Sequence, residues 1–375
     1  MKKSIFLLCG MLCCFQAFSQ EAEESDTQWL IIPRVDVNPY ARLSSNGLKG
    51  FDWGSTSLYT TFDGGIGESN FSYSVEAHWL STDTKSLYDN TFRSDDVNWL
   101  DWANITYSLG NFDFTLGKDC IKIGTFEINA NDFDSFSNLN STVWNNASIY
   151  QWGGSVGYNF DDGSSNVALQ VTSSPFNCHP FSKWMEDEDG NHYSAKRSLA
   201  YSLAYTGDYE SLQTLASVNV LEDRNSMEEN AYVLALGAIY KFSDTFSAGA
   251  DIMGLGWKKP SFKQEGLFSA NVTWNACDRF SLTAKAGYEY CGNNTGIFDY
   301  EPEDDMSDHF VPTSISFLHG ELDKDFVFGG LQAIWYPFAE CENFRVHAVV
   351  STNNFAKSLS FNVGATYYFD IRKLF

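Results

Sequence analysis

Apolar and polar residues alternate with a period of two along most of the chain beyond residue 27. The even positions from 280 to 290 are all apolar, namely Phe280, Leu282, Ala284, Ala286, Tyr288 and Tyr290. The odd positions between them hold Ser281, Thr283, Lys285, Gly287 and Glu289. Residues 71–79 and 359–369 follow the same rule, with the odd positions apolar. This period is typical of β-strands that present one apolar face and one polar face.

Weaker versions of the pattern extend this prediction to 16 strands. The strands are expected near 28–38, 51–62, 70–80, 98–109, 111–119, 151–160, 165–173, 198–207, 211–221, 230–242, 244–255, 265–275, 279–291, 325–337, 343–352 and 358–371. The predicted fold class is therefore all-β.

Short and long connections alternate between these strands. Short turns are expected at 63–65, 110–111, 161–163, 207–208, 243–244 and 277–278, and long segments at 81–97, 120–150, 174–197 and 292–324. Outer-membrane β-barrels have an even number of antiparallel strands, short periplasmic turns and long extracellular loops. With both termini on the periplasmic side, the long segments fall where extracellular loops belong. We therefore predict a single transmembrane antiparallel β-barrel of about 16 strands over residues 28–375.

A soluble β-sandwich also alternates, and it is the main alternative for the fold. Strands of about 9–12 residues favour the barrel, because they match a tilted bilayer crossing and exceed ordinary sandwich strands. Aromatic residues on the apolar positions are consistent with aromatic girdles; they are Trp29, Trp79, Trp99, Tyr158, Tyr201, Tyr232, Tyr240, Tyr288, Trp335 and Tyr367. The terminal Phe375 resembles the C-terminal assembly signal of outer-membrane barrels.

Composition narrows the class of protein further. Aromatic residues make up 16% of the chain, which is too much apolar surface for a disordered protein. No apolar run reaches about 18 residues, which excludes a protein with several transmembrane helices. The formal net charge of -24 argues against nucleic-acid binding, since a phosphate backbone needs a basic surface.

The N-terminus has the pattern of a secretory signal peptide. Lys2 and Lys3 precede an apolar stretch from 5 to 15 and an A-x-S cleavage site before Gln20. We expect residues 1–19 to be removed and residues 20–27 to form a short N-terminal segment, too short for a plug domain. Five cysteines then remain, Cys120, Cys178, Cys277, Cys291 and Cys341. No two of them have C-x-x-C spacing, so a disulfide framework or zinc site is not indicated, and a single bridge stays open.

Three short stretches, 104–107, 117–119 and 123–127, resemble the corresponding region of the phosphate-selective porin O and P family. In that family a strand, a short turn and a strand ending near Gly-Lys lead into a loop folded inside the barrel. The resemblance implies a 16-stranded channel that assembles as a trimer, with basic residues lining its constriction. Here Lys118 and Lys122 are surrounded by acidic residues, namely Asp119, Glu127, Asp132 and Asp134. The charges therefore favour a general or cation-tolerant channel over a phosphate-specific one.

The segment 120–150 is the best candidate for a constriction loop inside the lumen. It is long and polar, and it carries apolar residues that could anchor it to the wall: Ile121, Ile123, Phe126, Phe133, Phe136 and Trp144. An ordinary surface loop is the alternative. Further charges on polar strand positions are predicted to line the pore, namely Arg34, Glu76, Lys241, Asp251, Lys285, Glu289 and Arg345. Opposite charges facing each other across the opening would set a transverse field that selects by charge and size.

Other functions find less support in the sequence. The acidic runs 186–191 and 301–305 could bind Ca²⁺ but lack EF-hand spacing, so solvated loop charge is preferred and no metal site is predicted. None of the six histidines lies in a nucleophile motif, so no catalytic residue and no enzyme activity are predicted. A β-protein that binds glycans or partners through aromatic loop residues remains the alternative to a channel.

The sequence as a whole predicts an outer-membrane porin of a Gram-negative bacterium. It would act as a passive diffusion channel for small hydrophilic solutes or ions, filtered by charge and size. Its expected partners are outer-membrane lipid, lipopolysaccharide and the permeating solute, with a homotrimer implied by the resemblance. No cofactor and no nucleic-acid partner are expected.

Overall fold

The computed structural model describes residues 27–41, 48–52, 56–80, 100–129, 139, 141, 149–160, 163–175, 184–186, 192–194, 197–224, 229–291, 325–338, 343–354 and 359–374. The predicted signal peptide at 1–19, Asp132, Asp134, the acidic run at 301–305 and Phe375 lie outside these residues. Within the described ranges, no helix is long and apolar enough to cross a membrane.

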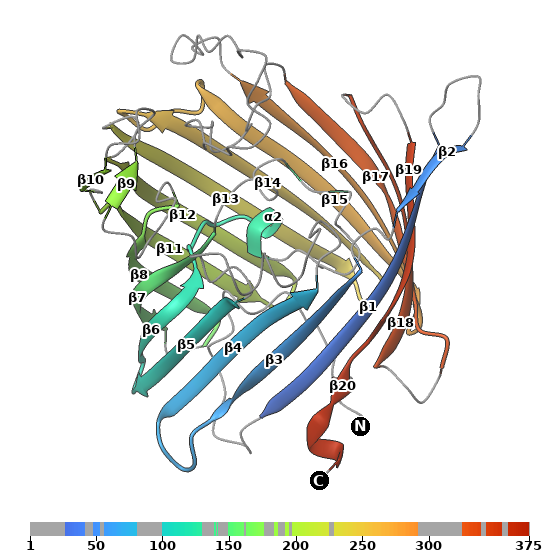
Figure 1. Ribbon diagram of the computed structural model, residues 1–375, viewed down its shortest axis with the longest axis horizontal. Helices are drawn as coiled ribbons and strands as arrows, with labels where there is room; N and C mark the ends of the chain where they lie inside the picture. The colour runs from blue at the N-terminus through green and yellow to red at the C-terminus, as the bar shows by residue number, and fades with distance from the viewer. Residues whose placement is uncertain are drawn as a thin grey trace.

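Sixteen long antiparallel strands form a closed barrel (Figure 1). They are β1 (Gln28–Ala41), β3 (Ser57–Gly65), β4 (Phe71–Leu80), β5 (Leu100–Leu109), β6 (Phe112–Cys120), β7 (Tyr150–Asn159), β8 (Ser165–Ser173), β11 (Leu199–Tyr209), β12 (Leu212–Asp223), β13 (Glu229–Ser243), β14 (Phe246–Trp257), β15 (Glu265–Cys277), β16 (Phe280–Cys291), β17 (Phe326–Trp335), β18 (Phe344–Asn353) and β19 (Leu359–Tyr367). Each strand pairs with its neighbours along the chain, and β1 pairs with β19 to close the ring. Closure removes the unpaired sheet edges that a bilayer does not tolerate.

Short elements complete the described fold. β2 (Leu48–Asp52) pairs with the end of β1, and β20 (Phe369–Asp370) continues the path of β19 along β1. β9 (Trp184–Glu186) and β10 (His192–Ser194) form a separate small hairpin. The one-turn helix α2 (Phe126–Asn129) follows β6, and the 3₁₀ turn η1 (Ile371–Leu374) follows β20.

The predicted alternation of short and long connections is confirmed. Two-residue turns join β5 to β6, β11 to β12, β13 to β14 and β15 to β16 at one rim. β1 begins and β20 ends at this same rim (Figure 1). The longest connections, between β4 and β5, β6 and β7, β8 and β11, and β16 and β17, join strand ends at the other rim.

Three details of the predicted strand boundaries were wrong. The turn expected at 207–208 lies inside β11, and the chain reverses at 210–211 instead. The expected strand 51–62 is divided between β2 and β3, because β2 pairs only with the far end of β1. The turn expected at 63–65 lies inside β3, and the chain reverses at 66–70 instead. Gly67 there has a φ of 58°, a left-handed conformation that glycine adopts without steric cost.

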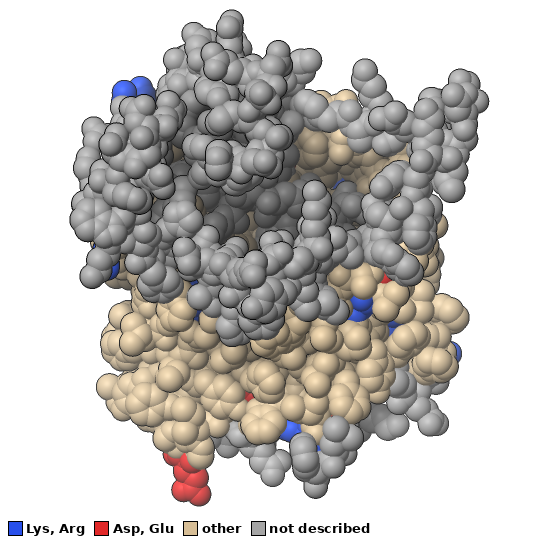
Figure 2. Space-filling view, in the orientation of Figure 1, with Lys and Arg blue, Asp and Glu red and all other residues tan. Residues whose placement is uncertain are grey.

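The outer surface of the barrel is an apolar belt, as the alternation predicted. Leu116 is 74% exposed and Leu169 is 61% exposed, although both lie in the middle of strands. Several aromatic residues predicted to face outward are also exposed, namely Trp29, Tyr201, Tyr240, Tyr288, Trp335 and Tyr367. The visible wall below the upper rim carries few charged groups (Figure 2). Such a surface suits contact with lipid rather than water.

The inner wall is less uniformly polar than the sequence predicted. Inward positions of β12 to β17 near the rim with long connections carry buried apolar residues, which form one cluster. They include Leu221, Val233, Met253, Leu255, Leu267 and Phe326. Elsewhere the inner face is polar, with Gln170, Asp251, Gln332 and Asn362 as examples. An apolar inner wall needs an apolar cover, and the segment after β6 supplies it.

A charge placed in the outer belt should destabilise the barrel according to its depth. Leu203 lies near the middle of β11, between the buried Ser202 and Ala204, and is 47% exposed. We expect Leu203→Arg to lower the free energy of unfolding by about 2–4 kcal/mol, because the guanidinium would lie in hydrocarbon. Phe338→Arg, next to the rim with short turns, should lower the free energy of unfolding by only about 1 kcal/mol or less. Equilibrium unfolding in lipid vesicles measures both values, and equal costs would contradict the assignment of the belt.

Candidate functional site

The segment after β6 follows the inner wall of the barrel. We call residues 121–129, together with Leu139 and Ser141, the inner segment. The backbone N–H of Lys122 donates to Gln170 Oε1 on β8 at 2.9 Å, and that of Gly124 donates to Ser217 Oγ on β12 at 2.8 Å. Further along, the segment contacts β14, β16 and β17. These wall residues lie on the strand faces opposite the exposed apolar belt, so the inner segment lies inside the barrel.

Asp251 of β14 holds the N-terminus of α2. Its Oδ1 accepts the backbone N–H of Phe126, and its Oδ2 accepts that of Glu127, each at 2.8 Å. The first N–H groups of a helix have no partner within the helix, so an external carboxylate can satisfy them. The negative charge at a helix N-terminus is favourable as well. Asp251 is 3% exposed, so these bonds are shielded from water.

A buried ion pair holds the same turn from β16. Lys285 Nζ lies 2.5 Å from Glu127 Oε2, and the two side chains are 5% and 0% exposed. The other carboxylate oxygen, Glu127 Oε1, accepts the backbone N–H of Ser141 at 2.6 Å. Glu127 therefore ties the two described parts of the inner segment to each other and to the wall. Removing one partner of such a pair leaves a buried charge without compensation, which is strongly destabilising.

Glycine allows the inner segment to lie directly against the strands. A Cβ at Gly124 would overlap the backbone of Ala216 and lie 2.6 Å from the backbone nitrogen of Ser217. A Cβ at Gly237 of β13 would overlap Asp251 Oδ1 and lie 2.9 Å from Phe126 Cδ2. On β17, a Cβ at Gly330 would lie 2.5 Å from Leu139 Cδ2. At Gly124 the neighbouring atoms belong to the backbone, so no side chain fits there, whereas at Gly237 and Gly330 the named neighbours are side-chain atoms.

Gly124→Ala is expected to displace the inner segment, since the methyl group would collide with main-chain atoms that cannot rotate away. We expect a loss of about 1–3 kcal/mol of stability, typical of overpacking in a tight core. Gly329→Ala on β17 is the control, because the new Cβ would lie 3.3 Å from its nearest neighbour, the carbonyl oxygen of Lys285. Thermal unfolding of both variants checks this, and equal stabilities would show that Gly124 does not contact the wall closely.

Apolar side chains fix the inner segment from the other direction. Ile121 and Ile123 are fully buried, and Ile128 is 3% exposed. All three belong to the cluster that includes Val233, Met253 and other residues of the inner wall. The prediction that Ile121 and Ile123 anchor this segment agrees with their burial. Phe126, in the same turn, is half-buried. Phe133, Phe136 and Trp144 lie outside the described residues.

Four of the predicted pore charges meet at or beside the inner segment. Glu127, Asp251 and Lys285 form the contacts described above, and Lys122 lies at the start of the segment with 8% exposure. Ser269 Oγ lies 3.5 Å from Asp251 Oδ2 and adds a hydroxyl to the group. Two carboxyl groups and one ammonium, those of Glu127, Asp251 and Lys285, therefore lie together on the inner wall, and a second ammonium, that of Lys122, lies at the start of the inner segment.

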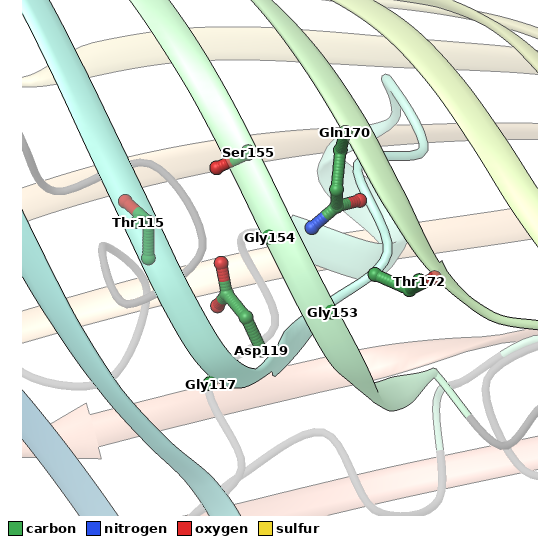
Figure 3. Close-up of a pocket in the computed structure, with 8 residues that line it drawn as sticks. All are labelled: Thr115, Gly117, Asp119, Gly153, Gly154, Ser155, Gln170 and Thr172. Atoms are coloured by element: carbon green, nitrogen blue, oxygen red, sulfur yellow. The ribbon is translucent and has the colours of Figure 1, made fainter.

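Asp119 lies in a small niche on the wall where the inner segment begins. The niche is formed by β6, β7 and β8, where glycines leave the wall thin (Figure 3). Its lining residues are Thr115, Gly117, Asp119, Gly153, Gly154, Ser155, Gln170 and Thr172. Asp119 Oδ1 accepts the backbone N–H of Cys120 at 2.9 Å, which fixes the carboxylate where the inner segment begins.

The structure does not bring the remaining predicted charges to this group. Lys118 lies on the same face of β6 as the exposed residues Phe112, Phe114 and Leu116, which is the outer face of the barrel. Its Nζ donates to the carbonyl oxygen of Leu100. Lys241 is exposed two residues before the end of β13.

Other predicted charges are buried elsewhere on the wall. Glu76 Oε2 accepts the Thr61 hydroxyl at 3.1 Å between β4 and β3. Glu289 of β16 is fully buried. Arg34 and Arg345 lie on β1 and β18, where Arg345 stands 5.4 Å from the centre of the Tyr368 ring.

Several residues that shape the site were not predicted. Gln170 and Ser217 of the wall bind the inner segment, and Ser141 binds Glu127 within it. The glycines Gly124 and Gly237 allow the segment to lie close to the wall. Ser217 and Gln170 occupy polar strand positions, as do many other lumen residues, so nothing in the sequence distinguishes them. The apolar inner wall did leave a signal, since β13 from Ala231 to Ile239 is apolar on both faces. A strand buried on both faces reads as a continuous apolar run.

Chemically, the site is a group of carboxyl, ammonium and amide groups on the inner wall. Among the described residues, no group of three or more His, Cys, Asp or Glu side chains could hold a metal ion. Cys120 is buried and Cys277 exposed, and both are free thiols.

Comparisons with known proteins agree with this architecture. No protein-family model matches the chain, and no curated protein matches its sequence. The outer membrane channel DcaP of Acinetobacter baumannii matches in structure with a TM-score of 0.57 at 14% identity, covering 94% of this chain and all of that one. A loop-deletion mutant of OmpT, an outer membrane protein of Vibrio cholerae, matches with a TM-score of 0.56 at 13% identity, covering 92% of this chain and all of that one.

A mutant of the Rh. blastica porin matches with a TM-score of 0.53 at 12% identity, again covering 92% of this chain and all of that one. The chain therefore has the 16-stranded barrel fold of outer-membrane porins. At these identities the likeness concerns the fold alone. Membership of the phosphate-selective porin O and P family is not confirmed.

Proposed function

We propose that the protein is an outer-membrane porin, a passive diffusion channel for small hydrophilic solutes or ions. The observation that carries this proposal is the inner segment, which contacts the inner wall from β8 to β17. A barrel of this strand number is wide enough for water, so its selectivity depends on whatever narrows it. Among the described residues, the inner segment would narrow the opening.

The charges around the inner segment would act as the filter. Glu127 and Lys285 form an ion pair, and Asp251 adds a second carboxyl group beside them. Arg345 lies on β18, in a different part of the wall, and Arg34 on the neighbouring β1 is paired with Asp36. A solute passing between these two regions meets a field across the pore, which favours ions according to sign and excludes large molecules. The excess of carboxylate beside α2 supports a cation-tolerant channel rather than a phosphate-specific one.

The setting of this channel follows from the same reasoning. The apolar belt would contact outer-membrane lipid and lipopolysaccharide after export directed by the N-terminal signal peptide of a Gram-negative bacterium. A homotrimer is proposed as the assembly, supported by the trimer form of the Vibrio cholerae OmpT among the structural matches. No cofactor takes part, since diffusion through a preformed opening needs no chemical step.

Swelling of proteoliposomes in uncharged sugars tests the proposal. We expect fast uptake of small sugars and a steep fall as the sugar grows, because the inner segment sets a size limit. Liposomes that contain heat-denatured protein are the control for leakage. Uptake equal to that control, with the barrel shown to be folded and inserted, would overturn the channel. Retention of a sugar without uptake would favour a glycan-binding barrel instead.

A further inference from the structure

β1 and β19 form the seam at which the barrel closes, because they are the first and last of its long strands. Near the middle of the seam, Asp36 of β1 lies opposite Gly364 of β19. Gly364 in turn lies opposite His347 of β18. Asp36 and His347 are buried on the inner face. Their side chains therefore face each other across Gly364.

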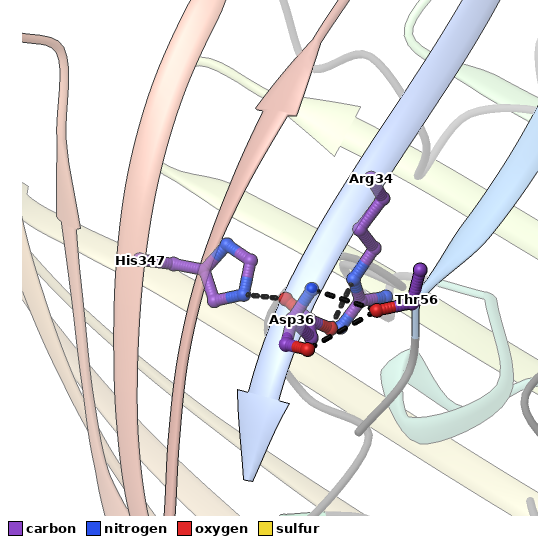
Figure 4. Close-up of polar contacts among 4 residues, drawn as sticks. All are labelled: Arg34, Asp36, Thr56 and His347. Atoms are coloured by element: carbon purple, nitrogen blue, oxygen red, sulfur yellow. Dashed lines mark hydrogen bonds and ion pairs between the residues drawn. The ribbon is translucent and has the colours of Figure 1, made fainter. Parts of the chain in front are cut away.

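The side chains of Asp36 and His347 point toward each other (Figure 4). His347 Nε2 lies 2.7 Å from Asp36 Oδ1, and Arg34 Nε lies 2.6 Å from Asp36 Oδ2. The Thr56 hydroxyl accepts the backbone N–H of Asp36 at 2.9 Å and donates to its carbonyl oxygen at 3.1 Å. The side chains of Arg34, Asp36 and His347 are 2% exposed or less.

Gly364 makes this contact possible. A Cβ at that position would overlap Asp36 Oδ1 and lie 2.5 Å from His347 Nε2. Gly364 has no positive φ, so its backbone conformation does not require a glycine. The close approach of the two side chains does. Asp36 and His347 are 311 residues apart in the sequence, so only closure of the barrel brings them together.

We propose that Asp36 and His347, joined above Gly364, form a clasp that fastens the barrel seam in one register. Before closure, β1 and β19 are sheet edges with unpaired backbone groups, which are costly in a membrane. The contact spans three strands, so it forms only when β1 and β18 are both correctly paired with β19. A slip of one residue in either ladder would turn one of the two side chains to the lipid face. The clasp therefore selects the native register at the step that completes the barrel.

Heat-induced opening of the folded barrel, followed by its altered mobility on SDS gels, tests the clasp. Asp36→Asn, His347→Gln and Gly364→Ala should each lower the opening temperature by roughly 5–10 °C, as expected when a buried pair loses one partner. The double variant Asp36→Asn/His347→Gln should open no earlier than Asp36→Asn alone, because Asp36→Asn already weakens the contact with His347 as well as the one with Arg34. Ser351→Ala, on the same buried face of β18, is the control and should leave the opening temperature unchanged.

A disulfide across the seam separates this role from general stability. Val37 and Val363 lie opposite each other on β1 and β19, and Leu169 and Leu203 lie opposite each other on β8 and β11. In a Cys277→Ser background, oxidised Val37→Cys/Val363→Cys should restore the opening temperature of His347→Gln, whereas oxidised Leu169→Cys/Leu203→Cys should not.

Two results would overturn the clasp. One is an equal rescue by both disulfides, and the other is a set of single variants that open at the same temperature as Ser351→Ala. If His347→Gln does not fold, the yield of folded barrel replaces the opening temperature as the readout. The seam disulfide should then raise that yield, and failure to do so also counts against the clasp.

Discussion

Asp251→Ala is expected to raise the single-channel conductance and to weaken the size limit of the pore. The carboxylate accepts two backbone N–H groups at the start of α2, and its removal leaves both without their partner. Hydrogen bonds to a charged group contribute about 1.5–3 kcal/mol each, so the docked inner segment should lose about 3 kcal/mol or more. A loss of that size shifts the docking equilibrium about 100-fold toward the undocked segment.

Planar-bilayer recording of purified Asp251→Ala measures this effect. Ser269→Ala is the matched control, because Ser269 Oγ lies 3.5 Å from Asp251 Oδ2 and its loss leaves both N–H bonds intact. We expect larger and noisier steps for Asp251→Ala and wild-type steps for Ser269→Ala. A folded Asp251→Ala barrel with wild-type conductance and sugar exclusion would show that the inner segment does not depend on Asp251.

Lys285→Gln is expected to shift ion selectivity toward cations. The ammonium offsets the charge of Glu127 within a group that also holds Asp251. A unit charge about 8 Å from the ion path contributes about 0.5–1 kcal/mol in a wet pore, which corresponds to a change of about two- to five-fold in the permeability ratio. Glu127→Gln should shift the ratio in the opposite direction. Both variants should also be less stable, because each leaves one buried charge without its partner.

Lys241→Gln separates the local charge from the total charge of the chain. Lys241 is exposed beside the turn after β13, and its removal changes the net charge of the protein by the same amount. The reversal potential in a salt gradient should therefore move for Lys285→Gln and stay close to wild type for Lys241→Gln. The difference should shrink near 1 M salt, where the Debye length falls to about 3 Å. Equal shifts in the two variants would place the selective charges away from the inner segment.

The strands could be predicted from the sequence because lipid and lumen impose opposite demands on successive residues. That constraint is local, so alternation alone identified strands such as β16 and β19. β2 was merged with β3 because its short length and its pairing with β1 leave no separate pattern. The inner wall from β12 to β17 was expected to be polar, because a strand between lipid and a water-filled lumen has one apolar face and one polar face. On these strands the apolar residues of the inner wall contact the inner segment instead of water.

The charges of the site could be predicted, and their partners could not. Glu127, Asp251 and Lys285 stood out as charged residues on polar positions or in a long loop. Their pairing depends on the path of the inner segment around the wall, which joins residues 124 positions apart in the case of Glu127 and Asp251. His347 and Asp36 illustrate the same limit at the seam, since closure of the whole ring is needed before they meet.

The most direct test of a charge-filtering channel is the reversal potential of the mature wild-type protein in a planar bilayer under a salt gradient. The arrangement of Glu127, Asp251 and Lys285 predicts discrete conductance steps and a reversal potential of the sign that indicates cation preference. Discrete steps with anion preference would contradict the assignment of the filter to these residues. A silent bilayer that contains folded, inserted protein would contradict the channel itself.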